Sequence, residues 1–386
     1  MKKVILLIDC VGEFDRRLMR GMFRYSKENG GWLFYRIPPS YNPSHDDGGK
    51  AIAQWAKKWN ADAIVGRWNY PDTKEIEKLN IPIVLQNVRS RSDKFSNLTG
   101  DYLGTGKIAA DFFYHRRYAN FAYFGVKDII WSEERRQGFE QEARKLGCDV
   151  RSLTVEPQNE HNETIIGEWI KSLPKPVAVF CCDDSHALTI SETCKVVGVS
   201  IPDELALLGV DNDELMCEIS DPPISSILLD VENGGYMVAK QLDDYINKKK
   251  EGAFNVTITP GTIVQRASTQ RHNVSDPYIA KLIRYIDDNF TQDITTTQIL
   301  SQIPFSRRCV ELKFRREMNG ITIYKYLTMC RIDYFAQLLT STDLPQNEIA
   351  VMAGISDYSN FSRIFKKIKG VSPMEYRRQN KLNIKK

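Results

Sequence analysis

Apolar and polar positions follow two different patterns along the chain. From the N-terminus to residue 266, short apolar runs occur at residues 4–8, 63–65, 81–85, 121–124, 178–181 and 205–209. Longer stretches with apolar residues at helical spacing lie between them, such as residues 16–28 and 108–115. Strands that alternate with helices predict parallel sheets covered on both faces. Because this segment is longer than one sheet ordinarily needs, we expect two α/β lobes.

The pattern changes after residue 266. Residues 267–277 are polar and show no periodicity, which is typical of a linker. Beyond them the chain predicts only helices, beginning with an amphipathic stretch over residues 277–290. We therefore expect a two-lobed domain over residues 1–268, a linker over 269–277 and an all-α domain over 278–386.

The helical part contains a sequence pattern that occurs twice. Residues 306–316 and 357–367 each end in a phenylalanine and two basic residues, and a glycine follows a few residues later. A short helical stretch and a turn precede each copy, and this order is typical of the helix-turn-helix unit. An amphipathic stretch over residues 323–339, capped by Thr322, lies between the copies and is expected to hold them rigidly. Two such units meet the DNA major groove about 34 Å apart.

Net charge separates the two parts of the chain. From Asp276 to the C-terminus there are 18 Lys and Arg residues against 11 Asp and Glu residues, a net charge of +7. The whole chain carries only +4, so the preceding part is mildly acidic. A basic C-terminal domain favours a polyanionic partner for that domain alone, although chance variation in surface charge remains the alternative.

Motifs in the second copy carry a family resemblance. They are Asn347-Glu348-Ile349-Ala350, Gly354-Ile355, Phe361-Ser362-Arg363, Phe365-Lys366-Lys367, Gly370 and Ser372-Pro373. On these residues the C-terminal part is identified as a member of the AraC/XylS family of DNA-binding domains. In the first copy Pro304, Val310 and Leu312 depart from the family pattern, so the second unit is the better match.

The resemblance implies a division between core and DNA-contacting residues. Phe314, Ile349, Ala350, Phe361 and Phe365 are expected in the core, since buried aromatics suit such spacing. Arginine can make bidentate hydrogen bonds to guanine and asparagine to adenine, whereas lysine mostly contacts phosphate. A solvated surface residue is the alternative for each candidate, and a structural ion pair is a further one for Arg363. The DNA-binding candidates are Arg307, Arg308, Arg316, Ser359, Asn360, Arg363 and Lys366.

Polar residues follow several of the predicted strands in the front part. Ligands of parallel α/β sheets bind at the carboxyl ends of strands or in the cleft between lobes. The sequence contains neither a glycine-rich phosphate loop nor a nucleophile elbow. Its five histidines do not show the spacing of metal ligands. The pattern therefore favours binding over catalysis, and we expect no catalytic residue, cofactor or metal.

The front part resembles the LacI/GalR regulators and the periplasmic-binding-protein type I fold. The strings that carry this resemblance include Trp131-x-x-Glu134-Arg135, Val199-x-Ile201-Pro202 and Gly209-Val210-Asp211-Asn212. Together with an AraC-type tail, the arrangement is similar to that of xylose operon regulators over essentially the whole chain. The resemblance thus implies a two-lobed α/β periplasmic-binding-protein type I fold followed by an all-α domain with two helix-turn-helix units.

The resemblance also implies a sugar pocket. Carboxylates and guanidinium groups bind sugar hydroxyls through charge-assisted hydrogen bonds, and an aromatic ring covers the apolar face of the sugar. For Asp183 the alternative is a helix cap, and for Trp131 it is packing between lobes. The implied ligand-binding residues are Asp9, Phe14, Asp15, Arg67, Trp131, Arg135, Asp183 and Asp211.

The function implied is a sugar-responsive transcription regulator that is not an enzyme. It would activate carbohydrate-utilisation genes in response to a pentose such as xylose, with another monosaccharide or small polar ligand as the alternative. Two other readings stay open. One is a sugar-processing enzyme with Asp183 and Asp211 as acid and base. The other is a constitutive DNA binder with a degenerate front domain. The implied partners are double-stranded DNA with tandem half-sites, a monosaccharide effector, RNA polymerase and a second copy in a homodimer.

The sequence predicts a cytoplasmic protein without a membrane segment. The apolar run at residues 4–8 is shorter than the roughly 7–15 residues of a signal peptide, and no run reaches the ~18 residues of a membrane span. Eight cysteines occur without the two-residue spacing of zinc or redox sites. Scattered cysteines of this kind are typical of a reducing compartment.

Overall fold

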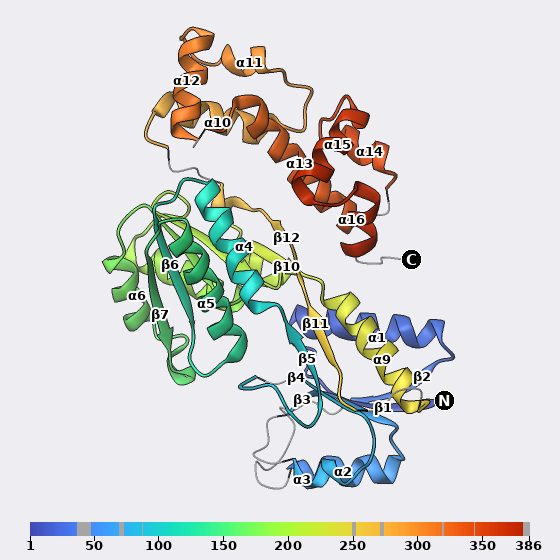
Figure 1. The fold of residues 1–386 in the computed structure, drawn as a ribbon. Coiled ribbons are helices and arrows are strands. Elements are labelled where there is room, and N and C mark those ends of the chain that lie inside the picture. The colour runs from blue at the N-terminus through green and yellow to red at the C-terminus, as the bar shows by residue number, and fades with distance from the viewer. Residues whose placement is uncertain are drawn as a thin grey trace.

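The computed structural model describes residues 1–36, 48–68, 73–86, 88–248, 252–270, 274–318, 320–342 and 344–380. They form two α/β lobes and a separate helical unit, shown in orange and red in Figure 1. This arrangement confirms the predicted fold class. No helix within these ranges is long and apolar enough to cross a membrane.

The first lobe is built on a six-stranded sheet in the order β11-β5-β4-β3-β1-β2. Its strands pair in parallel, and helix α1 packs against α9 beside the sheet. The strands are β1 (Lys2–Leu7), β2 (Trp32–Arg36), β3 (Ala63–Arg67), β4 (Ile83–Gln86), β5 (Ser96–Gly100) and β11 (Asn255–Ile258). The helices are α1 (Glu13–Glu28), α2 (Gly48–Trp59), α3 (Lys74–Glu77) and α9 (Val231–Ile246).

The second lobe has a similar sheet in the order β12-β10-β9-β8-β6-β7, in which only the pairing of β10 with β12 is antiparallel. Helix α4 packs against α5 on this lobe. The strands are β6 (Asn120–Val126), β7 (Val150–Val155), β8 (Val177–Cys181), β9 (Leu205–Val210), β10 (Ser225–Leu229) and β12 (Pro260–Val264). The helices are α4 (Tyr102–His115), α5 (Ile130–Lys145), α6 (Glu163–Ser172), α7 (Asp184–Val197) and α8 (Glu214–Ile219).

The sequence explains why the central strands form where they do. Every residue of β8 and β9 is buried, as expected for a parallel strand covered on both faces. Strand β10 is also fully buried but begins with two serines, which need internal hydrogen bonds. Ser226 Oγ donates to Asp184 Oδ1 at 2.6 Å, and Ser225 Oγ shares a 2.6 Å hydrogen bond with Thr269 Oγ1.

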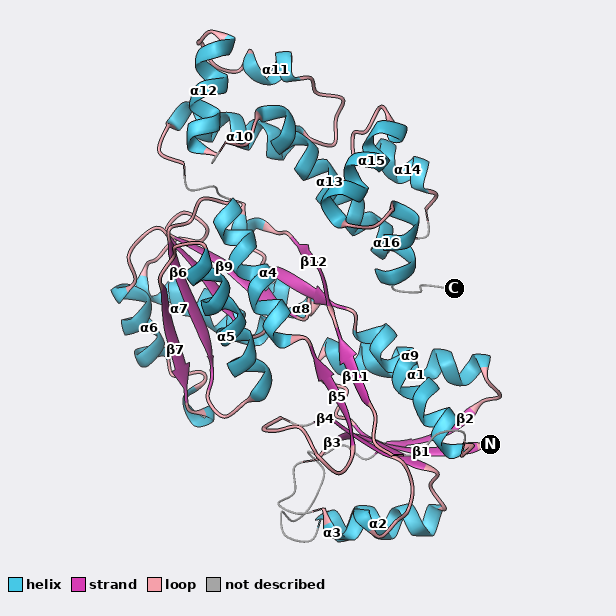
Figure 2. Cartoon of the chain, viewed as in Figure 1, coloured by secondary structure: helices cyan, strands magenta, loops and turns pink. Residues whose placement is uncertain are grey.

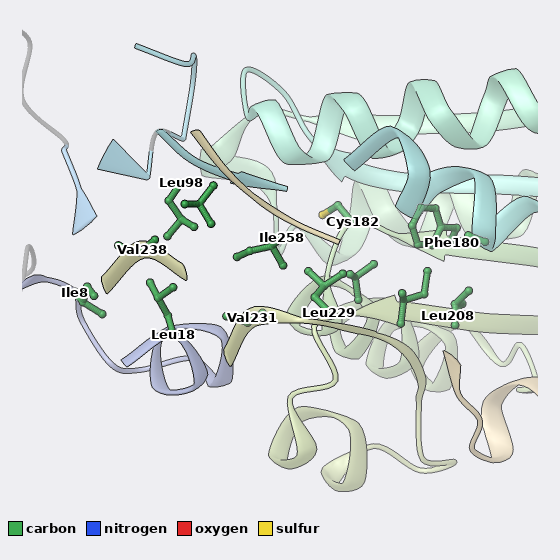
Figure 3. Packing of buried hydrophobic residues seen from close by; sticks show 14 of the residues in the cluster. Ile8, Leu18, Leu98, Phe180, Cys182, Leu208, Leu229, Val231, Val238 and Ile258 are labelled. Atoms are coloured by element: carbon green, nitrogen blue, oxygen red, sulfur yellow. The ribbon is translucent and has the colours of Figure 1, made fainter. Parts of the chain in front are cut away.

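The chain crosses between the lobes three times, from β5 to α4, from β10 to α9 and from β11 to β12. One hydrophobic cluster continues through these crossings (Figure 3). It joins Leu18 and Leu98 of the first lobe to Leu208 of the second, with Val231 and Ile258 at the crossings. A continuous apolar cluster therefore connects the two lobes at the crossings.

The C-terminal unit is entirely helical (Figure 2). It contains two separate cores, one on each half of the long helix α13. Ser306, Thr322 and Asp357 accept backbone N–H groups at the starts of α12, α13 and α15, which confirms the predicted helix starts. The helices are α10 (Pro277–Asn289), α11 (Thr296–Leu300), α12 (Arg307–Glu317), α13 (Ile323–Ser341), α14 (Gln346–Met352), α15 (Tyr358–Lys369) and α16 (Pro373–Asn380).

A short segment joins the lobes to this unit. Ser268 and Thr269 are fully buried against the second lobe, and Ser268 Oγ donates to the carbonyl of Leu207 at 2.6 Å. Helix α10 starts at Pro277 after the capping residue Asp276. Thr269 of the proposed linker 269–277 thus packs on the second lobe, while residues 271–273 lie outside the described residues.

Candidate effector pocket and DNA-binding faces

A cavity of about 320 Å³ opens where the carboxyl ends of strands from both lobes meet. This volume lies at the lower end of the roughly 300–1,000 Å³ of small-molecule sites. Six of the eight predicted ligand-binding residues line it, and Gln86, Val88 and Tyr102 join them without having been predicted. The lining residues are Phe14, Arg67, Gln86, Val88, Tyr102, Trp131, Arg135, Asp183 and Asp211.

Asp15 and Asp9 do not line the cavity. Asp15 is only 2% exposed, and its Oδ1 accepts a hydrogen bond from Arg67 Nη2 at 3.1 Å. Burial raises the pKa of the Asp15 carboxyl, while the charge of Arg67 opposes the rise. Asp9 follows β1, and its carbonyl accepts a hydrogen bond from Arg36 Nη1 at 3.2 Å. Asp15 therefore holds the Arg67 side chain at the cavity rather than facing the cavity itself.

Arg135 is the most buried charge in the cavity wall, at 3% exposure. Its Nη1 donates to the carbonyl of Cys182, and its Nη2 lies 3.6 Å from Asp211 Oδ1. The guanidinium carbon lies 5.5 Å from the ring centroids of both Tyr102 and Trp131, within cation–π range. Arg135 thus joins a carboxylate and two aromatic rings from three different elements.

Asp211 occupies a strained backbone conformation, with φ at 97°. A non-glycine residue in this region costs on the order of 1–3 kcal/mol and persists only when its surroundings impose it. Its N–H donates to the Ile227 carbonyl at 3.0 Å, and its own carbonyl accepts from Arg17 Nη1 at 3.3 Å. Burial raises the pKa of the Asp211 carboxyl, and the charge of Arg135 works against that rise.

Asp183 serves two purposes at the end of β8. It caps α7 by accepting the His186 N–H at 2.9 Å, and the same Oδ1 lies 2.6 Å from His186 Nδ1. Burial alone would raise the pKa of Asp183, but the charge and hydrogen bonds of His186 lower it. Burial would lower the pKa of His186, yet Cys182 and Asp183 raise it well above its usual value. Asp183 therefore caps α7 and lines the cavity at the same time, and its carboxylate is paired with His186.

The same neighbourhood contains a set of metal-binding atom types. One ligand atom each from Cys182, Asp183 and His186 lies within 4.8 Å of the others. The spacing of histidines along the sequence does not mark this group, because only one histidine belongs to it. Tetrahedral zinc separates neighbouring N and O ligands by roughly 3.3 Å. The 2.6 Å between Asp183 and His186 fits a shared proton instead, and burial raises the pKa of the Cys182 thiol that metal binding would deprotonate.

Three buried side-chain atoms of cavity-lining residues lack a hydrogen-bond partner among the described residues. They are Gln86 Oε1, Arg135 Nε and Asp211 Oδ1. Buried polar atoms in folded proteins nearly always have a partner, so each such exception needs an explanation. One acceptor on the first lobe and a donor and an acceptor on the second suit a ligand that both donates and accepts. The rings of Phe14, Tyr102 and Trp131 supply apolar surface in the same cavity.

The DNA-reading candidates lie on two exposed helix faces. Arg307, Arg308 and Arg316 are exposed at the start and end of α12, although Arg307 Nε donates to Glu311 Oε1 at 2.9 Å. The predicted core residue Phe314 is fully buried on the same helix. Arg315, which was not among the candidates, is exposed as well.

The second face is the more clearly defined. On α15 the four candidates Ser359, Asn360, Arg363 and Lys366 are all exposed. Phe361 and Phe365 are buried on the opposite side of the helix, and Ile349 and Ala350 of α14 join their core, as predicted. No ion pair to Arg363 occurs among the described residues, which leaves its guanidinium available for a ligand.

Comparisons with known proteins agree with this geometry. Residues 110–269 match the periplasmic binding protein-like domain family, and residues 301–379 match a helix-turn-helix domain family. The xylose operon regulatory proteins of Escherichia coli and Haemophilus influenzae are each 25% identical to this chain. The first match covers 98% of this chain and 97% of the relative, and the second covers 97% and 98%.

A solved structure shares the whole fold. The structure of a xylose-binding transcription activator aligns over 98% of both chains with a TM-score of 0.59 at 22% identity. The two domain matches and the full-length similarity confirm the predicted resemblance. The chain joins a periplasmic binding protein-like domain to a helix-turn-helix domain, and its similarity to the xylose operon regulatory proteins extends over both.

Proposed function

We propose that this chain, with its two-lobed binding domain and AraC-type tail, is a sugar-responsive, DNA-binding transcription regulator and not an enzyme. The full-length relatives are regulatory proteins by name. The observation that carries the sugar-sensing part is the set of three polar side-chain atoms that lack a hydrogen bond among the described residues, on residues that line a cavity with aromatic rings. In this account a monosaccharide occupies the cavity and changes the affinity of the helix-turn-helix units for DNA.

A monosaccharide suits the cavity on chemical grounds. Sugar hydroxyls can donate to the side chains of Asp211 and Gln86 and accept from that of Arg135. The carboxylates and arginines make such hydrogen bonds charge-assisted and therefore stronger than neutral ones. Trp131 and Tyr102 offer ring surface for the C–H face of the sugar. Phe14, Arg67 and Asp183 complete the proposed binding set.

The effector we favour is a pentose, with xylose as the first candidate. The full-length relatives regulate xylose operons by name, and the structurally similar activator is described as xylose-binding. Another monosaccharide is the second candidate, because one added or lost polar contact can change specificity strongly. Gln86 and Arg67 are the first-lobe polar residues in the cavity wall and therefore the places where such a change would act.

The output we propose is activation of carbohydrate-utilisation genes in the cytoplasm. Helices α12 and α15 each enter a major groove of tandem half-sites in double-stranded DNA. Arg307, Arg308 and Arg316 act on the first half-site, and Ser359, Asn360, Arg363 and Lys366 on the second. A homodimer and a contact with RNA polymerase complete the proposal. The separate cores on the two halves of α13 support two rigidly spaced reading units.

A thermal-shift screen of monosaccharides tests the sensing part. A bound ligand at 100 times its dissociation constant stabilises a protein by about 2.7 kcal/mol, which is readily detected. We expect a pentose to raise the melting temperature of the parent and to leave an Asp211→Asn variant unchanged. Equal shifts in both proteins, or no shift with any pentose or hexose, would overturn the proposed pocket.

A further inference from the structure

The loop after strand β9, residues 211–213, carries a cavity residue and is held by both lobes. Its first residue, Asp211, lines the cavity. The three backbone N–H groups of the loop donate to acceptors in the second lobe at 3.0, 3.0 and 2.7 Å, and these acceptors are the Ile227 carbonyl, Ser226 Oγ and Asp184 Oδ2. The second lobe thus fixes the loop through its donors.

Arg17 of α1 holds the carbonyl groups of the same loop from the first lobe. Its Nη1 donates to the Asp211 carbonyl at 3.3 Å, and its Nη2 donates to the Asn212 carbonyl at 3.1 Å. The arginine is only 8% exposed, and its Nε donates to Glu13 Oε1 at 3.1 Å. Because a guanidinium group presents its donors in a rigid plane, the two carbonyls are held in one relative position.

Asp213 makes the reciprocal contact from the second lobe to the first. Helix α1 begins at Glu13, and the preceding Gly12 has no side chain that could cap it. Asp213 Oδ2 accepts the Glu13 N–H at 3.0 Å and lies 3.7 Å from Arg16 Nη2. A carboxylate at the start of a helix satisfies a free N–H group and suits the helix dipole. The loop and the first turns of α1 therefore bind each other across the lobes.

The backbone of the loop is strained where Arg17 holds it. Asp211 and Asn212 both have positive φ, 97° and 50°. Residues other than glycine keep such conformations only where their surroundings impose them. Arg17 acts from a fixed helix, since a Cβ added at Gly21 of α1 would collide with the carbonyl oxygen of Glu232 in α9. The direction of the Asp211 side chain therefore depends on a contact with the first lobe.

We propose that Arg17 is a positioning residue for the sugar, because it holds the Asp211 and Asn212 carbonyls and so orients the Asp211 carboxylate toward the cavity. The inference rests on the proposed function and adds a residue that does not line the cavity. Arg17 belongs to the first lobe and Asp211 to the second, so the carboxylate is fully placed only while the lobes keep this arrangement. A sugar that binds Asp211 favours that arrangement over others.

The test measures sugar binding to the full-length chain by calorimetry, with D-xylose or whichever monosaccharide shifts the parent's melting temperature. Arg17→Met keeps an apolar stem and removes every donor, and it should weaken sugar binding about tenfold or more, as for a lost hydrogen bond to a charged group. Arg20→Met is the matched control on the same helix. Arg20 is exposed and also pairs with Glu13, but it makes no hydrogen bond to residues 211–213 among the described residues, so its affinity should stay within twofold of the parent's.

Monodeoxy analogues of the sugar distinguish positioning from a general loss of structure. In the parent, the analogue without the hydroxyl that donates to Asp211 should bind about tenfold or more weakly than the sugar itself. In Arg17→Met that difference should fall below threefold, while the penalties for removing the other hydroxyls stay at their parent values. A purely structural role of Arg17 would instead weaken the sugar and all its analogues by the same factor.

The outcomes separate this inference from the proposed function. If no monosaccharide binds the parent, the proposed sensing function fails. If sugar binds the parent and Arg17→Met equally well, or if the loss is uniform over all analogues, only the role of Arg17 fails. Should Arg17→Met not fold, Arg17→Lys carries the same test, because it keeps the charge but one ammonium group does not reproduce the paired donors of a guanidinium group.

Discussion

The pocket and helix α15, the proposed DNA-reading helix, place their polar residues in opposite environments. In the pocket, Arg135 is 3% exposed and Asp211 sits on strained backbone, and polar atoms remain without partners among the described residues. On α15, Asn360 and Arg363 are exposed on a regular helix whose other face is packed. The pocket is thus preorganised at a cost in stability, whereas the reading face adds little to the stability of its helix.

The difference has a general consequence for substitutions. A change in the pocket should affect both stability and sensing, because it leaves a buried partner uncompensated. A change on the reading face should affect DNA binding alone, since substitutions at exposed sites usually alter stability by only about 0.5 kcal/mol. The two regions should therefore be separable by measuring stability and binding on the same variants.

The largest expected effect belongs to Arg135→Ala. Its loss removes the partner of Asp211 and the donor to the Cys182 carbonyl, in a group that is nearly fully buried. We expect a loss of about 3–5 kcal/mol in the free energy of unfolding, as for broken buried ion pairs, and no stabilisation by sugar. Denaturant unfolding with and without sugar measures both quantities.

Arg136→Ala is the matched control on the next residue of α5. Arg136 pairs with Glu133 and Glu140 at the surface, so its removal should cost no more than about 1 kcal/mol and preserve sugar binding. Equal losses in the Arg135 and Arg136 variants would erase the proposed distinction between a buried pocket charge and a surface charge.

A second expected effect concerns how the stability of the chain depends on pH through Asp287 of helix α10. The pKa of Asp287 is about 6 in the folded chain against its ordinary 3.8, so the folded chain holds a proton over this range that the unfolded chain releases. This contribution to stability is complete below pH 3.8 and is lost as pH rises through 6. The groups that act on Asp287 are Arg116, Tyr326, Asp288 and Cys330. Asp287→Asn should therefore lose less stability than the parent between about pH 4 and 6, and parallel pH profiles would refute this.

A third effect should appear on the reading face alone. Arg363→Ala removes an exposed guanidinium that has no ion pair among the described residues, and it should weaken operator binding by about 1–3 kcal/mol. Its melting temperature should stay close to that of the parent, because Phe361 and Phe365 keep the helix packed. Operator titrations paired with thermal melts check this, and an unchanged operator affinity would remove Arg363 from the contact set.

The smallest effect is expected for Lys366→Ala. A lysine that meets phosphate contributes similarly on all sequences, so specific and non-specific DNA should be weakened alike. The slope of log affinity against log salt should decrease by about 1. Salt titrations on operator and on random DNA measure it, and a loss confined to the operator would instead make Lys366 a base reader.

The DNA-binding unit could be predicted closely because its signals are local. The cap Thr322 and the spacing of Phe361 and Phe365 are visible in the sequence, and each occupies its predicted place. Ser306 and Asp357, which begin the two repeated segments, also cap helices. Helix boundaries of this kind depend on a few neighbouring residues.

The pocket could be predicted only in part. Arg135, Asp183 and Asp211 stand at strand ends or in a recognisable motif, but no local signal marks Tyr102, which begins the helix after a crossing between lobes. Gln86 likewise faces the cavity only because two sheets meet there. Strands β5 and β10 contain buried serines and asparagine, whose hydrogen bonds form in the tertiary structure and which hydropathy alone does not reveal.

The central claim is that occupancy of the pocket changes DNA binding by the tail. Fluorescence-anisotropy titration of labelled operator DNA, at a sugar concentration that calorimetry shows to saturate the pocket, tests it most directly. The account predicts at least a fivefold difference in operator dissociation constant between the sugar-bound and sugar-free protein, and none for an Arg135→Ala protein. Identical operator affinity of the parent with the pocket empty and saturated would contradict it.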